Sequence, residues 1–373
     1  MKKILFITGT RADFGKLKKL MRFVESSSMF ELHVFGTGMH MMQRYGSTYR
    51  EVEKENYKHT YFIPNQHVGE PMCSILGNTI NIFSRLTNEI SPDLIVIHGD
   101  RLEALAGATV GALQNRLVCH IEGGELSGTV DEVIRHSVSK LSNVHMVANQ
   151  EAEKRLLQMG EIKDSIYIIG SPDLDVMKSD DLPTIDQAMS KYEIVNSEYS
   201  IVLFHPVTTE KDSFEHYTEN FFEALKEVPG QYVIVYPNND DGSEYIINAI
   251  ENNSDNPKFS VFPSIRFEYF LVLLKNAKCI IGNSSAGIRE APFYGVPTVN
   301  VGSRQNNRSA GNTILNCDYD KNSIINAVIE AQNLDVTTPS FCFGDGDSLS
   351  KFKKAIESDN FWMTSKQKVF VDL

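Results

Sequence analysis

Short apolar runs alternate along the chain with segments that have the periodicity of amphipathic helices. Runs such as Asp93–His98 and Tyr232–Tyr236 predict strands, and longer segments such as Met72–Glu89 and Arg266–Lys275 predict helices. Short strands that are separated by helices are typical of parallel βαβ units. The pattern therefore predicts an α/β protein with parallel sheets.

The alternation is interrupted between Ser171 and Ser197. This stretch is polar, contains Pro172 and Pro183, and has only a weak helical pattern. A chain of 373 residues is also longer than one hydrophobic core usually supports. The simplest architecture is two α/β domains of similar size with a cleft between them. We expect a first domain over residues 1–175, a second over 198–348, and a helical segment over 349–373 that packs back on the first.

Composition narrows the functional classes. A hydrophobic content of 42% and a charged content of 23% are ordinary for a globular protein. The net charge of -12 argues against nucleic acid as a partner. No apolar run approaches the roughly 20 residues of a membrane span, and the first apolar run lacks a small-residue cleavage site. The five cysteines are scattered without a CxxC pair, so reduced thiols in a cytoplasm are expected rather than zinc.

Three carboxylates stand at predicted element ends within the stretch from residue 98 to 149. Asp100 follows one strand, Glu122 follows the next, and Asp131 lies in the first turn of the helix after it. Because ligands of open α/β sheets bind where strands end and helices begin, we expect these groups to converge on one crevice. Carboxylates that share a pocket push their pKa values apart, which provides one acid and one base.

Each carboxylate also has a local interpretation. Asp131 and Arg135 are four residues apart and could form a surface ion pair. Asp100 could pair with the adjacent Arg101. Glu122 is harder to explain in this way, because it ends an apolar strand and enters the loop GGELSG, which has too little bulk for core packing. Such a loop lets a ligand approach the backbone closely.

Two glycine-containing turns suit a phosphate. The first, GTRADFG, follows the first strand, precedes a helix predicted from Lys16, and carries Arg11. The second, GNSSAG, places Ser284 and Ser285 at a predicted helix N-terminus, and Glu290 further along could accept hydrogen bonds from a ribose. The alternatives are a plain strand-to-helix turn and a serine that only caps its helix.

His205 and Asn238 both follow strands of the second predicted domain. Beside a bound diphosphate, a histidine there could stabilise the leaving group. A lone histidine is, however, more often structural. The cysteines, histidines and carboxylates form no visible ligand cluster, so we expect no essential metal.

At this point the chain closely resembles the UDP-N-acetylglucosamine 2-epimerases, and most closely the hydrolysing branch of bacterial sialic acid synthesis. The resemblance rests on ten motifs in order: GTRADFGKL, TGMHM, HGDRLEALAGA, HIEGGELSGTVDEVIRHSVSKLS, GSPDLD, FHPVTTE, YPNND, PSIRFEYFLVLLKNA, GNSSAGIREAP and VGSRQ. It implies two Rossmann-like domains of glycosyltransferase-B type with an interdomain cleft. It also implies conversion of UDP-N-acetylglucosamine and water into N-acetylmannosamine and UDP, by a cytoplasmic homodimer or dimer of dimers without a cofactor.

The resemblance also implies roles for individual residues. The catalytic set is Asp100, Glu122, Asp131 and His205. The implied contacts to the UDP-sugar are Arg11, Lys16, Arg101, Asn238, Phe262, Arg266, Ser284, Ser285, Glu290 and Arg304. Among these, Ser284, Ser285 and Arg304 match contacts to the diphosphate, Glu290 matches the ribose ligand, and Phe262 and Arg266 lie where the family holds the uracil.

Several alternatives stay open. Non-hydrolysing relatives carry a glutamine-histidine-arginine run where this chain has Met39-His40-Met41, which favours the hydrolysing branch. The same chemistry on a 2,4-diacetamido-trideoxy sugar, as in legionaminic acid synthesis, is a further alternative. A glycosyltransferase would not need the three carboxylates, and a catalytically silent nucleotide-sugar sensor would need only the diphosphate and uridine contacts.

Overall fold

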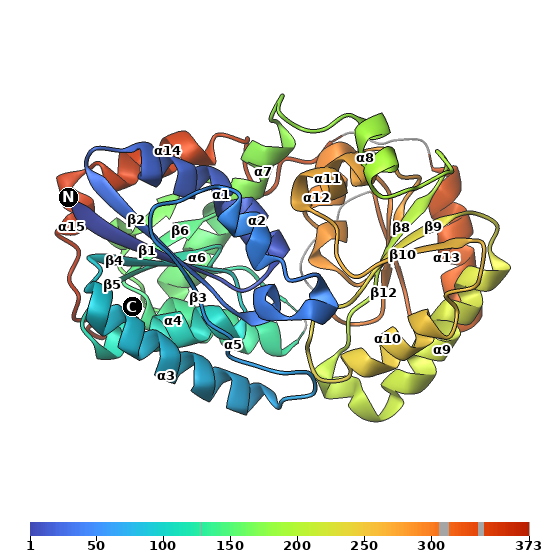
Figure 1. Cartoon of the computed structure of the whole chain (residues 1–373), viewed down its shortest axis with the longest axis horizontal. Coiled ribbons are helices and arrows are strands. Elements are labelled where there is room, and N and C mark those ends of the chain that lie inside the picture. Colours follow the sequence, from blue (N-terminus) through green and yellow to red (C-terminus); the bar gives the residue numbers. More distant parts are fainter. Residues whose placement is uncertain (128, 306–312, 335–338, 373) are drawn as a thin grey trace. The chain divides into compact units, whose positions relative to one another are not determined.

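The computed structural model describes residues 1–127, 129–305, 313–334 and 339–372 (Figure 1). The chain divides into two compact units. The first contains Met1–Glu125, Asp131–Ser179 and Cys342–Leu373, and the second contains Leu126–Val130 and Asp180–Phe341. Each has its own parallel sheet, as expected for two α/β domains.

The first unit is built on a seven-stranded sheet with the order β3-β2-β1-β4-β5-β6-β7. All of its recorded strand pairs are parallel. The order reverses between β1 and β4, so this is the point at which an open sheet offers a crevice. The strands are β1 Lys2–Thr8, β2 Phe30–Gly36, β3 Thr60–Phe62, β4 Leu94–His98, β5 Leu117–Ile121, β6 Val144–Val147 and β7 Ile166–Ile168.

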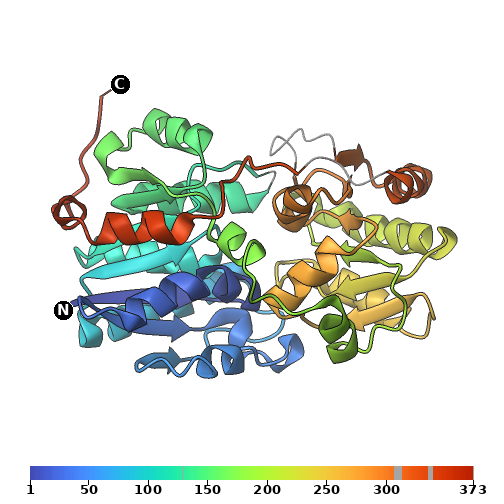
Figure 2. The same ribbon diagram turned by 90° about the horizontal axis from the view of Figure 1, so that it is seen from above.

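Helices from both ends of the chain complete this unit. Phe352 and Phe361, near the C-terminus, are fully buried in the same core as β1 and β4. The carboxylate of Asp175 accepts hydrogen bonds from the backbone N–H groups of Ser348 (2.8 Å) and Leu349 (2.7 Å) and so fixes the start of α14. Figure 2 shows α14 beside α1. The helices are α1 Arg11–Ser26, α2 Tyr49–Glu53, α3 Met72–Ile90, α4 Leu102–Leu113, α5 Val130–Leu141, α6 Gln150–Gln158, α7 Pro172–Met177, α14 Ser348–Ile356 and α15 Asp359–Trp362.

The second unit has a six-stranded sheet with the order β10-β9-β8-β11-β12-β13. Its order reverses between β8 and β11, and aromatic rings such as Phe204 and Phe221 (centroids 4.3 Å apart) fill its core. The strands are β8 Ser200–Leu203, β9 Tyr232–Val235, β10 Phe259–Phe262, β11 Ile280–Gly282, β12 Thr298–Val301 and β13 Ile314–Cys317. The helices are α8 Ile185–Lys191, α9 Lys211–Glu227, α10 Ser243–Glu251, α11 Phe267–Lys275, α12 Glu290–Tyr294 and α13 Lys321–Asn333.

Helix α1 starts five residues before the predicted Lys16, because Thr10 caps it. The Thr10 side chain accepts a hydrogen bond from the backbone N–H of Asp13 (3.1 Å). The GTRADFG turn is therefore mostly the first turn of a helix, and Arg11 is its first residue. An N-cap threonine is a strong start signal for a helix.

The sequence pattern of residues 39–45 predicts a helix, and this prediction is wrong. Two short 3-10 turns, Gly38–Met41 and Gln43–Tyr45, stand there instead. The His40 ring is buried and bonded on both sides, to Thr8 Oγ1 (3.1 Å) and Thr48 Oγ1 (2.7 Å). Gly38 has a left-handed φ of 62°, which lies outside the α-helical region. The tertiary contacts of His40 thus override the local helical preference.

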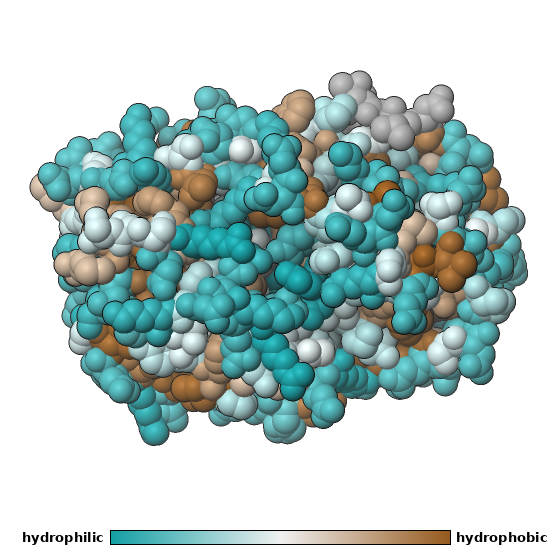
Figure 3. Space-filling view, turned by 45° about the horizontal axis from the view of Figure 1, so that its top comes forward, coloured by the Kyte–Doolittle hydropathy of each residue, from teal (hydrophilic) through white to brown (hydrophobic). Residues whose placement is uncertain are grey.

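The face drawn in Figure 3 is mostly hydrophilic, with apolar residues in small separate groups. Within the described residues, we find no helix that combines the length and the apolar character needed to cross a membrane.

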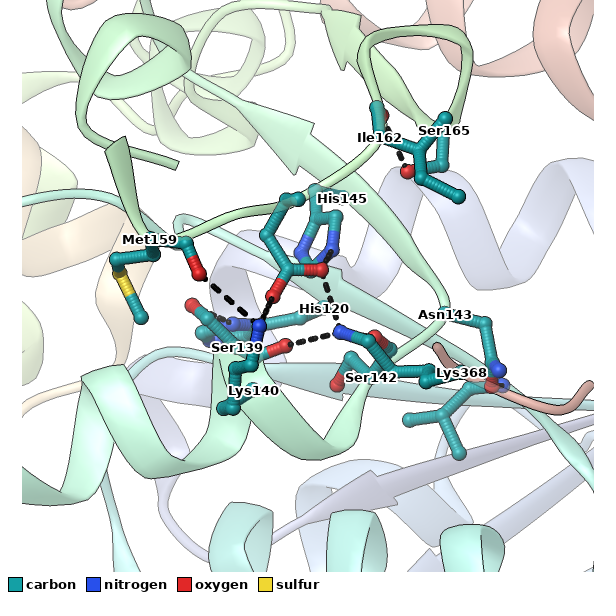
Figure 4. Close-up of polar contacts among 12 residues, drawn as sticks. His120, Ser139, Lys140, Ser142, Asn143, His145, Met159, Ile162, Ser165 and Lys368 are labelled. Carbon is teal, nitrogen blue, oxygen red and sulfur yellow. Dashed lines mark hydrogen bonds and ion pairs between the residues drawn. The ribbon is translucent and has the colours of Figure 1, made fainter. Parts of the chain in front are cut away.

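The C-terminal tail beyond α15 is held by a buried acid, Glu161. Lys368 on the tail pairs with the Glu161 carboxylate and donates to the backbone oxygen of Ser142 (2.6 Å), just past the end of α5 (Figure 4). Glu161 also pairs with His145 (2.8 Å) and Lys140 (3.2 Å). The tail therefore satisfies both a buried carboxylate and a carbonyl at the end of α5.

Candidate active site

At the sheet reversal of the first unit, three side chains form a buried chain of charges. The His98 ring, at the end of β4, donates through Nδ1 to Asp13 Oδ1 (2.8 Å), and its Nε2 lies 3.1 Å from Glu122 Oε2. Burial opposes the charged imidazole, but the carboxylates of Glu122 and Asp13 outweigh it and raise the pKa of His98 to about 10. An imidazolium therefore stands between two carboxylates at neutral pH.

The position of Glu122 is fixed by its backbone conformation and by hydrogen bonds to its backbone and its side chain. It follows β5 with a left-handed φ of 66°, which costs an L residue about 1–2 kcal/mol. Its backbone N–H donates to the oxygen of Met146 (2.9 Å), and Ser171 donates its hydroxyl to the second carboxylate oxygen. Such a strained and buried carboxylate is typical of a functional position.

Asp100 is paired with a buried arginine from α5. Arg135 contacts the Asp100 carboxylate, lies 3.1 Å from Glu125 Oε2, and donates to the backbone oxygen of Glu122 (3.5 Å). Burial works against this guanidinium, but Asp100 and Glu125 raise its pKa above the ordinary value. Arg135 thus joins the turns that follow β4 and β5. Glu132 and His136, one turn apart on α5, also form a local pair, at 3.5 Å.

Asp131 lies in the first turn of α5 and is partly buried. Arg135 is on the same face of this helix, one turn further on. Asp131 is therefore on the helix whose arginine holds Asp100. The structure thus places all three predicted carboxylates on elements that meet at the β4 and β5 ends of one unit.

The predicted cations of the first unit have carboxylate neighbours. Lys16 is buried in an ion pair with Asp173 (3.1 Å). Arg11 Nη2 lies 4.0 Å from Glu51, and Arg101 Nε lies 3.4 Å from Glu103. A phosphate at this turn would therefore compete with carboxylates that already face these cations.

In the second unit, His205 follows β8 at the sheet reversal and is buried. Its Nδ1 accepts a hydrogen bond from the backbone N–H of Asn238 (3.1 Å), which follows β9. An imidazole nitrogen that accepts a backbone N–H carries no proton, so the ring proton resides on Nε2. The neighbouring strand thus fixes His205 as a neutral donor.

Asn283, the residue after β11, ties this region together. Its side chain accepts from the His205 backbone N–H (2.7 Å) and donates to the His205 oxygen (2.9 Å). Its own backbone oxygen accepts from Arg304 (3.2 Å) and from the Gln305 side chain (2.8 Å). Arg304 is therefore positioned through Asn283, as His205 is.

The helix expected after GNSSAG is shorter than predicted. Ser284 caps a 3-10 turn over Ser285–Gly287 and accepts from the Ala286 N–H (3.3 Å), and α12 begins only at the buried Glu290. Thr298 Oγ1 donates to the Gly287 oxygen (2.7 Å), which takes the carbonyl that a continuous α-helix would use. The serines thus stand at a tight turn rather than at the start of a long helix.

Aromatic rings surround the position predicted for the base. The rings of Phe262 and Tyr192 meet edge to face, 5.4 Å apart. The Tyr192 hydroxyl accepts from the backbone N–H of Arg266 (2.9 Å), whose guanidinium lies 5.6 Å from the Tyr269 ring centroid. Tyr192 follows α8, in the stretch that the sequence pattern marked only as a polar boundary. Stacking surfaces of this kind suit a planar base.

Comparisons with known proteins agree with this architecture. The family model described as UDP-N-acetylglucosamine 2-epimerase matches residues 22–357. The chain belongs to this family. It is 56% identical to a Neisseria meningitidis serogroup B protein named UDP-N-acetylglucosamine 2-epimerase, over 100% of both chains. It is 33% identical to the UDP-N,N'-diacetylbacillosamine 2-epimerase (hydrolyzing) of Legionella pneumophila, over 94% of each.

A solved structure shows the same fold. The UDP-GlcNAc 2-epimerase from Neisseria meningitidis, bound to UDP-GlcNAc, has a TM-score of 0.79 with this chain at 17% identity, and the match covers 95% of this chain and 99% of the other. The fold class predicted from the sequence, two parallel-sheet α/β domains of glycosyltransferase-B type, is therefore confirmed.

Sequence reasoning missed several residues of this epimerase-family chain that hold the predicted ones in place. His98, Ser171 and Asn283 are polar residues at or just beyond a strand end, but their partners become visible only when the strands are in register. Asp13 and Arg135 lie within helices and Tyr192 follows one, so no strand-end pattern marks them. The missed residues are Asp13, His98, Arg135 (named only as a surface partner), Ser171, Tyr192 and Asn283. Among the described residues, no group of three or more histidines, cysteines and carboxylates is arranged to hold a metal ion.

Proposed function

We propose that this chain is a hydrolysing UDP-N-acetylglucosamine 2-epimerase that converts UDP-N-acetylglucosamine and water into N-acetylmannosamine and UDP for sialic acid synthesis. Family membership supports the epimerase chemistry, and the name of the Legionella relative, which specifies a hydrolysing enzyme, supports hydrolysis within this group. The observation that carries the proposal is that two acids lie on elements that meet at the ends of β4 and β5. Glu122 is anchored by His98, and Asp131 is on the helix whose Arg135 holds Asp100. An epimerisation that moves protons on two faces of a sugar needs more than one such group.

The proposed reaction begins with an elimination. A carboxylate removes the proton from C2 of the sugar while the bond between C1 and the diphosphate oxygen breaks. UDP departs, and 2-acetamidoglucal remains. Water then adds its oxygen to C1, and C2 receives a proton on the opposite face, which inverts that carbon. We assign the two proton transfers at C2 to Glu122 and Asp131, and positioning to Asp100.

The second unit supplies the proposed nucleotide contacts. The Nε2–H of His205 and the Ser284–Ser285 turn would donate hydrogen bonds to the departing diphosphate, and the guanidinium groups of Arg304 and Arg11 would offset its negative charge. Glu290 would bind the ribose, and Phe262 and Arg266 would bind the uracil. Anchoring of His205 through Asn238 and Asn283 supports this role, because leaving-group donors work best when they are preorganised.

Proton NMR in heavy water with UDP-N-acetylglucosamine tests the proposal. We expect free N-acetylmannosamine and UDP, with one deuterium at C2 of the product. Accumulation of UDP-N-acetylmannosamine without free sugar would instead identify a non-hydrolysing epimerase. Transfer of the sugar to an acceptor, with C2 unchanged, would contradict both.

A second substrate is favoured by one comparison. The Legionella relative is named for UDP-N,N'-diacetylbacillosamine. A parallel assay with that nucleotide sugar decides between the two. A higher kcat/KM for the diacetamido sugar would retain the hydrolysing chemistry and replace the proposed substrate.

A further inference from the structure

A buried histidine of β5, which the proposed mechanism does not use, touches the backbone beneath both anchored acids. His120 is fully buried, two residues before Glu122. Its Nε2 lies 2.8 Å from the backbone oxygen of Gly99, the residue before Asp100, and its Nδ1 lies 3.0 Å from Ser139 Oγ. Figure 4 labels both side chains. The carbonyl can only accept, so Nε2 carries the proton and Nδ1 accepts from the serine hydroxyl.

The same pair lies directly under the turn that carries Glu122. A side-chain carbon at Gly123 would stand 2.7 Å from Ser139 Oγ and 2.9 Å from His120 Nδ1. Only a glycine fits this approach, because real contacts of such a carbon are longer. The turn after β4 is bonded to the pair, and the turn after β5 rests against it. The His120–Ser139 contact therefore helps to fix the position of both turns.

Ser139 links this contact to α5. Asp131, Arg135 and Ser139 are spaced by four residues, so they lie along one face of this helix. The hydroxyl of Ser139 therefore helps to set the rotation of the helix that presents Asp131 and Arg135. Burial lowers the pKa of His120 to about 3, so the pair stays neutral in any ordinary assay and acts through geometry alone.

We propose that the His120–Ser139 pair is a positioning device that sets Asp100, Glu122 and α5 relative to one another for proton transfer at the sugar C2. The proposal rests on the proposed function. Displacement of a reacting group by about 1 Å can lower the rate by on the order of 10²-fold. Loss of one hydroxyl at this contact should therefore affect turnover much more than it affects folding.

Ser139→Ala tests the proposal, with Ser142→Ala as the matched control. Ser142 is also a fully buried serine at the end of α5, but its hydroxyl donates to the helix backbone oxygen of Val138 (2.7 Å). We expect Ser139→Ala to lower kcat by about tenfold or more, with KM and UDP affinity close to wild type. Ser142→Ala should keep kcat, and both variants should show similar small shifts in unfolding temperature.

A kinetic isotope effect separates positioning from a general loss of structure. With substrate deuterated at C2, the isotope effect on kcat should rise in Ser139→Ala, because proton removal becomes slower relative to the other steps. It should stay at the wild-type value in Ser142→Ala. His120→Gln, whose amide N–H can reach the Gly99 oxygen, should retain more activity than His120→Leu.

The outcomes are distinguishable from failure of the proposed function. An active wild type with equal kcat and equal isotope effects in Ser139→Ala and Ser142→Ala overturns this inference alone. A wild type that leaves C2 of every tested nucleotide sugar unchanged overturns the proposed function, and this inference falls with it.

Discussion

At the scale of single residues, the first unit contrasts two ways of holding a carboxylate. Glu122 faces a histidine and a serine, and Asp100 faces an arginine that also contacts Glu125. Both cations favour an ionised partner, but a guanidinium does not release its proton, whereas an imidazolium can pass its proton to a carboxylate. Glu122 is therefore the acid better suited to exchange a proton, and Asp100 is better suited to orient.

Replacement of the proposed acid/base groups should separate turnover from binding. We expect Glu122→Gln and Asp131→Asn each to lower kcat by about 10²-fold or more, because general acid–base catalysis contributes about 10²–10⁴-fold. UDP affinity, measured by calorimetry, should stay near wild type. Glu132→Gln is the control, since Glu132 neighbours Asp131 and its recorded ion pair is with His136 on the same helix. Near wild-type turnover in either acid variant would remove that residue from the mechanism.

Because His98 is charged in the folded protein, its contribution to the free energy of unfolding should fall as the pH becomes alkaline. Its pKa rises from 6.5 to about 10 on folding, so the stabilisation is complete below pH 6.5 and is lost as pH rises towards 10. Urea unfolding of wild type and His98→Gln between pH 6.5 and pH 10 should therefore give free-energy differences that shrink with pH. A difference that grows or stays constant would mean that His98 is neutral in the folded protein.

At the scale of elements, strand-and-helix alternation predicted the sheets and most helices, and tertiary contacts decided the rest. β9 and α11 occupy the segments that their patterns indicate. The helical segment expected over residues 349–373 is not one helix. α14 ends at Ile356, where Trp362 Nε1 donates to the Ile356 oxygen (2.7 Å) and Phe361 turns into the core. A local sequence pattern cannot show that a side chain further along the chain will hydrogen-bond to a backbone oxygen and end the helix there.

The candidate site likewise contains some residues that the sequence could predict and others that it could not. Asp100, Glu122 and His205 could be predicted because each directly or nearly follows an apolar strand. The pairing of His98 with Glu122 could not, because it depends on the register that sets His98 opposite Ile121. Tyr192 could not be predicted either, because it lies in a polar stretch of sequence without a clear strand or helix pattern. Residues at strand ends are thus visible in a sequence, but the residues that hold them depend on which strands are neighbours.

The tail lysine should stabilise α5 and its surroundings. Lys368→Met leaves the buried Glu161 with one cation fewer, and the loss of a hydrogen bond to a charged group costs about 1.5–3 kcal/mol. Chemical unfolding at pH 7 measures this loss. Lys366→Met, an exposed lysine of the same tail, is the control and should change stability little. Equal stability of the two variants would show that the tail contributes nothing to α5.

Acid should weaken the same anchor. Burial raises the pKa of Glu161, but hydrogen bonds from His145 and Lys368 outweigh it and lower the pKa to about 2 from 4.5. The stabilisation is therefore present above pH 4.5 and is lost as pH falls towards 2. Wild type should lose more stability than Lys368→Met over this range. Equal losses in the two proteins would show that Lys368 does not lower the pKa of Glu161 in the folded protein.

At the scale of the whole molecule, residues from the C-terminal part of the chain complete the hydrophobic core of the first unit. Phe352 is fully buried in the core of β1 and α1, although more than 300 residues separate them in sequence. Phe352→Ala should cost about 3–5 kcal/mol. Differential scanning calorimetry should show the shift in the transition of the first unit. Phe370→Ala, at an 85% exposed residue, serves as the control and should leave both transitions in place.

The chain leaves and re-enters the first unit through adjacent backbone segments. The Ser171 N–H donates to the Phe343 oxygen (2.8 Å), and Gly170 and Gly344 approach so closely that a side-chain carbon on Gly344 would meet the Gly170 backbone at 2.8 Å. In topological terms, residues 180–341 are an insertion whose two ends emerge side by side from the host. Replacement of residues 180–341 by a short flexible linker between Ser179 and Cys342 should therefore give a shorter protein in which the first unit folds on its own.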